Sequence, residues 1–220
     1  MKSFLIIGMG TFGHHVCRCL SKFKCEIMVA DNNAENVEDV LDIVVSAKIG
    51  NCTNIEVLRS FDVDKFDACF VCIGGNFQAS LEITDLLKEL GAKTVYSKAE
   101  TDIQAKFMRR NGADHIVFPE KDAAMRIATA ESSDDIFDFV SVSSEYAIFE
   151  ITCFPPWHGK SIIELNFRAE YGLNILGIKK NPGGFVANPK ADYVFEPTDH
   201  LMVFGTAQEV AHLEEIMRKK

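Results

Sequence analysis

Three glycines near the amino terminus have the spacing of a phosphate-binding turn. Gly8, Gly10 and Gly13 follow the apolar run Phe4–Ile7 directly and precede a helical pattern. In such a turn Gly8 makes the bend, Gly10 lets the backbone approach a pyrophosphate, and Gly13 lets the helix pack against the strand. The unpaired N–H groups and partial positive charge at the start of that helix attract a phosphate. The pattern therefore predicts a nucleotide site.

An acidic residue follows at the distance expected of a ribose-binding carboxylate. Asp31 ends the second apolar run, 23 positions after Gly8. A carboxylate there can accept hydrogen bonds from both hydroxyls of an adenosine ribose, and it would repel a 2′-phosphate. A glycine-rich turn without a ligand is the alternative, but it does not explain the preceding strand, the following helix and the acid together. We expect a nucleotide here, and the motif leaves its identity open.

Two other patterns could do chemistry but are better explained by packing. Cys69 and Cys72 have the CxxC spacing of a redox pair, yet they lie in an apolar run, and residues i and i+3 of a strand point to opposite faces. His14, His15 and Cys17 could be metal ligands on the first helix, but no fourth ligand of matching spacing accompanies them. The seven cysteines are an odd number in apolar segments, which indicates reduced thiols in a core.

Composition narrows the class of protein. The net charge of −9 over 220 residues argues against nucleic-acid binding, because a phosphate backbone is bound by clusters of Lys and Arg, and none is present before Arg218. No apolar stretch approaches the roughly 20 residues that cross a bilayer, and no secretory leader is apparent. We expect a cytoplasmic globular protein.

The first part of the chain alternates strand and helix patterns, which predicts an α/β fold with a Rossmann-like doubly wound parallel sheet. The predicted strands are 4–8, 26–30, 44–49, 68–73, 94–97 and 115–118, and the predicted helices are 12–23, 36–41, 55–61, 78–90, 102–111 and 121–131. Right-handed crossovers bring the carboxyl ends of the strands together. The loops after Gly8, Asp31, Asn51 and Ile73 should therefore converge on one crevice.

The pattern breaks between Ser132 and Asp138, so we place a domain boundary there, with residues 1–134 as the nucleotide-binding domain and 135–220 as a small α+β domain. Strands are predicted in the second domain at 146–154, 175–179, 185–187 and 201–204, with helices at 161–165 and 207–218. A module of this size is near the lower limit for an independent core, and oligomerisation would stabilise it.

Several local sequences occur in the order that is typical of one family. They are Gly8-Met-Gly-Thr-Phe-Gly13, Asp31-Asn32, Gly50-Asn-Cys-Thr53, Cys72-Ile-Gly-Gly-Asn76, Ser97-Lys-Ala99, Gly112-Ala-Asp114 and Pro119-Glu-Lys-Asp122. In the second domain they are Gly159-Lys-Ser-Ile-Ile-Glu-Leu-Asn166, Tyr171-Gly-Leu-Asn-Ile-Leu-Gly-Ile-Lys179 and Asp199-His-Leu201 with Gly205. The chain resembles the KTN/RCK family, the KtrA- and TrkA-like regulatory subunits of potassium transporters, over nearly its whole length.

The resemblance implies an RCK N-terminal (TrkA-N) domain, a small RCK C-terminal (TrkA-C) domain, and a gating function without catalysis. Such subunits form homo-oligomers, with dimers assembled into an octameric ring. The ring docks on the cytosolic face of a potassium-translocating Ktr or Trk membrane subunit, where ATP, ADP or NAD(H) shifts it between conformations. Two alternatives remain, an NAD-dependent oxidoreductase and a stand-alone nucleotide sensor of another membrane protein.

By the same resemblance, particular residues would contact the nucleotide: a phosphate turn, a ribose pair, an adenine loop, a crevice floor and a lysine that reaches toward phosphate. These are Gly8, Gly10, Thr11, Phe12 and Gly13, then Asp31 and Asn32, then Asn51, Cys52 and Thr53, then Ile73 and Gly74, and finally Lys98. Glu120 matches an acid that helps to hold a divalent cation. Cyclic di-AMP would bind the second domain near Ile162, Ile163, Asn174 and Pro189.

Other interpretations of these residues stay open. Thr11 stands where many relatives have an arginine that engages a γ-phosphate, and a neutral hydroxyl makes a weaker contact than a charged group, so the choice among ATP, ADP and a dinucleotide is open. Asn51 and Thr53 could instead cap a helix that begins at Ile55. Lys98 could be a solvated surface lysine, and Glu120 a first-turn acid favoured by the helix dipole.

Overall fold

The structure is a computed structural model that describes residues 1–131, 135–143 and 145–218. It divides into two compact units, Met1–Lys121 and Asp122–Lys220. The domain boundary predicted at residues 134 and 135 adjoins residues 132–134, which lie outside the described residues, and it stays a prediction.

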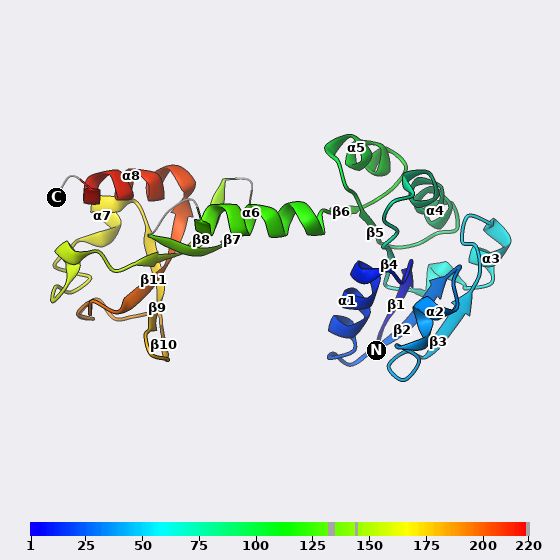
Figure 1. The fold of residues 1–220 in the computed structure, drawn as a ribbon, viewed down its shortest axis with the longest axis horizontal. Helices are drawn as coiled ribbons and strands as arrows, with labels where there is room; N and C mark the ends of the chain where they lie inside the picture. Colours follow the sequence, from blue (N-terminus) through cyan, green and yellow to red (C-terminus); the bar gives the residue numbers. More distant parts are fainter. Residues whose placement is uncertain (132–134, 144, 219–220) are drawn as a thin grey trace. The chain divides into compact units, whose positions relative to one another are not determined.

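The first unit is built on six parallel strands, as predicted. They are β1 (Lys2–Ile7), β2 (Cys25–Asp31), β3 (Ser46–Ile49), β4 (Ala68–Val71), β5 (Val95–Lys98) and β6 (His115–Val117), in the order β3-β2-β1-β4-β5-β6 (Figure 1). The second half of the central strand β1, residues 5–7, is apolar and buried because both faces of a doubly wound sheet are covered. The strand order reverses between β1 and β4, and such a reversal opens a crevice at the carboxyl ends of the strands.

Helices pack on both faces of this sheet. The core that includes Cys17 of α1 (Thr11–Leu20) and Val37 of α2 (Glu35–Glu38) lies on one face. The core that includes residues of α3 (Ile55–Arg59) and α4 (Phe77–Glu89) lies on the other. The remaining elements are η1 (Val63–Lys65), α5 (Asp102–Arg110) and α6 (Pro119–Glu131). Cys69 belongs to one of these cores and Cys72 to the other, which confirms that the CxxC pattern is not a redox pair.

The second unit is a five-stranded antiparallel sheet in the order β10-β9-β11-β8-β7, with a helical layer. Its strands are β7 (Ile136–Ser141), β8 (Tyr146–Thr152), β9 (Asn174–Lys180), β10 (Phe185–Ala187) and β11 (Asp199–Thr206). The other elements are η2 (Pro155–Trp157), α7 (Phe167–Tyr171) and α8 (Ala207–Arg218). Trp157 is fully buried at the centre of the core, packed edge-on against Phe154 and Phe167. The predicted α+β class is confirmed.

Two local predictions for the second unit fail. The helix predicted at 161–165 is wrong: Ser161 forms an isolated bridge with Val194, and a turn follows in which Glu164 accepts from the Ser161 N–H and hydroxyl, both at 2.7 Å. Asn166 then adopts a left-handed conformation (φ 46°), and the helix starts only at α7. Strand β7 was not predicted, because an irregularity between Ile136 and Asp138 breaks its period-two alternation.

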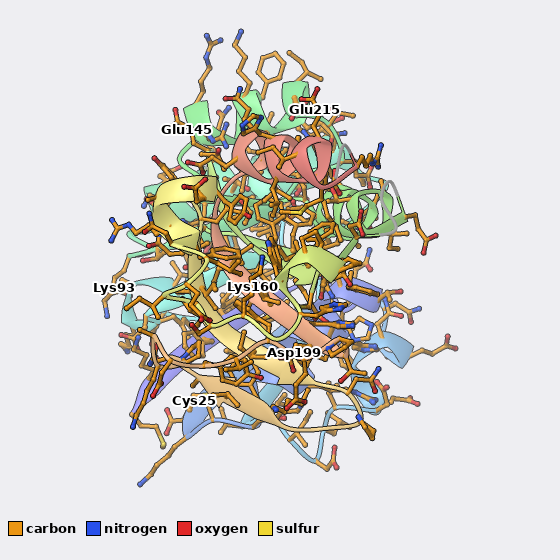
Figure 2. The ribbon with its side chains drawn as sticks, turned by 90° about the vertical axis from the view of Figure 1, so that its left-hand side faces the viewer. Cys25, Lys93, Glu145, Lys160, Asp199 and Glu215 are labelled. Carbon is orange, nitrogen blue, oxygen red and sulfur yellow. The ribbon has the colours of Figure 1, made fainter. Side chains whose placement is uncertain are left out.

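A buried carboxylate at the start of β11 gives a test of the second unit. Asp199, labelled in Figure 2, is fully buried, and its Oδ2 accepts from the Tyr193 hydroxyl at 2.8 Å and the Glu196 N–H at 2.9 Å. We expect Tyr193→Phe to lower the free energy of unfolding by about 1.5–3 kcal/mol, because a carboxylate loses a hydrogen bond in a buried site. Trp157 is the only tryptophan, so its fluorescence during denaturant unfolding reports this unit alone.

The matched control is Tyr146→Phe, because Tyr146 is 43% exposed on β8 and its ring stacks on Phe204. Its stability should be unchanged. Equal unfolding curves for Tyr193→Phe and the wild type would show that the Asp199 contact does not stabilise the fold.

Candidate functional site

A cavity of about 690 Å³ lies at the carboxyl ends of β1, β2, β3 and β4. The predicted convergence of four loops is confirmed, since all of them contribute to its lining. Predicted site residues in the lining are Gly8, Gly10, Asp31, Asn32, Asn51, Cys52, Thr53, Ile73 and Gly74. Residues from β1 and β2, Asn36 of α2, and one face of α4 complete it. Its position is the one where open α/β sheets bind their ligands.

The three glycines of the turn are needed for different physical reasons. Gly8 has φ +91°, a backbone conformation that other residues rarely adopt. A Cβ on Gly13 would lie 2.1 Å from the Gly8 carbonyl oxygen, so only glycine fits there. Gly10 has φ −75°, and no heavy atom in the described part of the chain lies within 4 Å of a Cβ built on it. The fold therefore needs Gly8 and Gly13, whereas Gly10 keeps the cavity open.

The start of α1 is suited to an anion. Gly10 is the N-cap residue, no side chain among the described residues caps this end, and the first turn contains no acid. The other predicted phosphate residues, Thr11, Phe12 and Gly13, form that first turn. Thr11 is exposed, Phe12 packs against the core beside α1, and Gly13 is buried. Their backbone N–H groups, rather than their side chains, are what the helix end offers to a phosphate.

Asp31 is buried at the carboxyl end of β2 and is held by three donors. Its Oδ2 accepts from the Met9 N–H at 2.6 Å, which ties it to the glycine turn. Its Oδ1 accepts from the Asn33 N–H at 2.9 Å and from Asn36 Nδ2 at 3.1 Å. A carboxylate has about four acceptor positions, so one remains for a ribose hydroxyl. Asn32 is exposed beside it.

The loop after β3 is not simply a helix cap. Asn54 caps α3, accepting from the Glu56 N–H at 3.0 Å, so the interpretation of Asn51 and Thr53 as caps is wrong. Instead, Asn51 Oδ1 accepts from both the N–H and the hydroxyl of Thr53, at 3.1 and 2.9 Å. This local turn orders a polar edge of the cavity.

The thiols of the cavity are not reactive. Cys52 and Cys72 both contribute to its lining but are almost wholly buried. Burial, with Asp31 adding to it, raises the pKa of the Cys52 thiol to about 11, and burial raises that of Cys72 to about 12. Both thiols therefore stay protonated near neutral pH, and a thiolate nucleophile is not available here.

Lys98 lies beside the cavity floor rather than in the lining. Its side chain is only 10% exposed, so the interpretation as a solvated surface lysine is wrong. Its Nζ contacts Glu120 Oε1 at 2.7 Å and lies 3.3 Å from a Cβ built on Gly74. The hydrogen bond from Lys98 lowers the pKa of Glu120. The predicted contact of Lys98 with phosphate stays a prediction.

Glu120 is exposed in the first turn of α6, where the helix dipole favours an acid. Among the residues that the structure describes, no group of three His, Cys, Asp or Glu side chains could hold a metal ion. The predicted role of Glu120 at a divalent cation therefore stays a prediction.

Sequence reasoning missed two parts of the site. Asn36, the second residue of α2, lines the cavity, and its side-chain amide donates to the Asp31 carboxylate. Gln78, Ala79, Glu82 and Ile83 reach the cavity from α4. The i, i+4 spacing of Gln78 with Glu82 and of Ala79 with Ile83 is the signal that could have marked one helix face.

The residues predicted for a second effector lie in the second unit. Ile162 packs against its core, and Ile163 is 67% exposed. Their N–H groups donate to the Tyr193 and Ala191 carbonyls, at 3.1 and 2.9 Å. Asn174 begins β9, and Pro189 follows β10. The binding of cyclic di-AMP at these residues stays a prediction.

Comparison with known proteins gives a consistent result for both units. The model of the TrkA-N domain matches residues 4–119, and that of the TrkA-C domain matches residues 147–218. The Ktr system potassium uptake protein C of Bacillus subtilis is 36% identical over 214 residues, 97% of this chain and 96% of that protein. The Ktr system potassium uptake protein A of Vibrio alginolyticus is 30% identical over 211 residues, 96% of each chain.

Solved structures share the fold. The GsuK channel bound to NAD aligns with a TM-score of 0.69 at 18% identity, over 98% of this chain and 39% of that one. The TrkA-N domain of the inner membrane protein ybaL from Escherichia coli aligns at 0.52 and 18% identity, over 58% of this chain and 95% of that one. This chain therefore spans less than half of the GsuK channel.

Proposed function

Because the chain belongs to the RCK family of TrkA-N and TrkA-C domain proteins, in the branch of the Ktr potassium uptake proteins, we propose that it gates potassium uptake in response to an adenine nucleotide. It is a regulatory subunit of a Ktr-type system, which requires a potassium-translocating membrane partner. Regulatory subunits of this kind are not enzymes, so the oxidoreductase alternative is not retained.

The strongest support for the nucleotide site comes from Gly10. Gly10 has an ordinary backbone conformation and free space at its Cβ, so the fold does not require glycine there. A phosphate lying against the backbone does require it, because a side chain would fill its place. The uncapped start of α1 directly follows Gly10, and Asp31 lines the same cavity as Gly10. These features support a phosphate beside Gly10 and a ribose beside Asp31.

The nucleotide would act by preferring one state of an assembly over another. A ligand shifts an equilibrium only by the difference in its affinity for the two states. Moving a 1:99 equilibrium to 99:1 takes about 5.5 kcal/mol, which several sites in one assembly can share. We propose that homodimers assemble into an octameric ring and transmit this preference to the membrane partner.

The location follows from that partner. Within the described residues, no helix combines the length and the apolar character that a membrane span requires. We propose that the subunit lies at the inner face of the cell membrane, held there by the protein that it regulates.

The proposed ligand is an adenine nucleotide, and the site does not select one member of this class. ATP, ADP and NAD(H) share the adenosine that Asp31 and the loop of Asn51 would contact, and Thr11 brings no charge that would favour a γ-phosphate. A divalent cation at Glu120 and cyclic di-AMP near Ile163 are further proposals that come from the family resemblance.

The direct test is to purify the protein without added nucleotide, denature it, and identify the released molecules by mass spectrometry. We expect ADP, ATP or NAD(H). Potassium uptake by vesicles that contain the reconstituted membrane partner should then respond to the molecule found. A protein that releases no nucleotide and binds none in calorimetry would exclude the proposal.

A further inference from the structure

The ribose carboxylate is linked to α1 through a side chain that the motif does not include. Asn36 Nδ2 donates to Asp31 Oδ1 at 3.1 Å, and the backbone oxygen of Asn36 lies 2.7 Å from Nε2 of His14. His14 is in the second turn of α1, directly after the glycine turn. These two contacts form a chain that runs from α1 through the α2 segment to Asp31.

The geometry fixes where the His14 proton lies. Nε2 faces two acceptors, the Asn36 oxygen at 2.7 Å and Asp39 Oδ1 at 3.2 Å. An unprotonated Nε2 would place a lone pair against both, so this nitrogen carries the hydrogen. The neutral and the charged ring can both donate from it.

The neighbouring ion pair cannot replace this contact. Arg18 and Asp39 meet at 2.8 Å, but their side chains are 58% and 52% exposed, and exposed pairs contribute little. The His14 side chain is 26% exposed, so its hydrogen bond to the Asn36 oxygen is better shielded from water.

The α2 segment needs such a contact. It is a four-residue helix whose N-cap residue, Ala34, makes no cap bond, although the Asn33 side chain accepts from the Glu35 N–H at 3.1 Å. So short a helix is not stable by itself. Val37 and Val40 are buried in the core shared with α1. Asn36 lies on the cavity side, and the bond from His14 restrains that side.

We propose that His14 is a positioning residue of the ribose subsite, which acts through Asn36 to hold the Asp31 carboxylate toward the ribose hydroxyls. The inference rests on the proposed nucleotide function. It predicts that His14 affects the affinity of ligands that have these hydroxyls and not the affinity of ligands that lack them.

The experiment compares ADP with 2′,3′-dideoxy-ADP by calorimetry. We expect His14→Ala to weaken ADP binding by about five- to tenfold, the size of one lost hydrogen bond, and to change dideoxy-ADP binding by less than about twofold. His14→Gln should restore ADP binding, because the Gln amide nitrogen can occupy the position of Nε2. His15→Ala, an exposed neighbour on the same helix, is the matched control and should bind both ligands like the wild type.

A second variant keeps the inference testable if His14→Ala is unstable. Asn36→Ala should produce the same selective loss for ADP, and the double variant should lose no more than either single one, because the two side chains act in series. Thermal unfolding of each variant checks that it is folded.

The outcomes separate the two proposals. Unchanged ADP affinity in folded His14→Ala, or an equal loss for ADP and dideoxy-ADP, would overturn the positioning role while the nucleotide site stands. A wild-type protein that binds neither ligand would overturn the proposed function itself.

Discussion

Replacing Gly10 with valine should abolish nucleotide binding and leave the first unit folded. The φ of −75° at Gly10 suits any residue, and a Cβ there meets no described heavy atom within 4 Å. The valine methyl groups would then occupy the space in front of the α1 N-terminus, where a phosphate must approach the backbone. The cost to stability should be about 1 kcal/mol, because valine is a poorer N-cap than glycine.

The measurement is calorimetric titration with ADP, together with thermal unfolding followed by circular dichroism. Gly13→Val is the contrasting variant: its Cβ would lie 2.1 Å from the Gly8 carbonyl oxygen, so it should disrupt the packing of α1 on β1 and prevent folding of the first unit. Wild-type ADP affinity in Gly10→Val would remove the glycine turn from the site.

Asp31→Ala should weaken the binding of adenine nucleotides by about 1–3 kcal/mol, because the hydrogen bond from a ribose hydroxyl to a charged acceptor is lost. The structure adds a second expected effect. Asp31 also accepts from the N–H of Met9, which is buried, so the variant leaves a buried donor unsatisfied and should lower the free energy of unfolding. Affinity and stability should therefore both fall.

Asp67→Ala is the matched control for that second effect. Asp67 Oδ2 accepts from the Ser3 N–H at 2.8 Å, at the amino ends of β1 and β4 and thus at the opposite edge of the sheet from the cavity. We expect Asp67→Ala to lower the free energy of unfolding without changing the ADP affinity. Thermal unfolding and calorimetric titration with ADP measure the two effects. If Asp31→Ala and wild type bind ADP equally, Asp31 is not the ribose acceptor.

Much of the first unit could be predicted because its signals are local. A buried parallel strand is a short apolar run, and each predicted run became a strand of the sheet. The glycine turn was visible for the same reason, because positive φ at Gly8 and close packing at Gly13 each demand glycine at a fixed spacing. The opposite orientation of Cys69 and Cys72 followed from the period of a strand.

The errors in the second unit arose where a single residue overrides a pattern. Residues 161–165 have helix-compatible composition, but the left-handed Asn166 separates them from α7. Strand β7 has apolar residues on both sides of an irregularity, so neither a period of two nor of 3.6 describes it. Local propensity is a weak guide at such positions, because contacts with neighbouring strands determine the conformation.

The α/β order, the glycine turn and the acid that ends β2 could thus be predicted from local patterns, since each depends on neighbours in the chain. Which side chains meet depends on the folded arrangement of distant segments. This arrangement paired Lys98 with Glu120, tied Asp31 to Met9 and Asn36, and brought one face of α4 to the cavity. The crossovers bring segments far apart in the chain to the same edge of the sheet, and no local pattern records contacts between them.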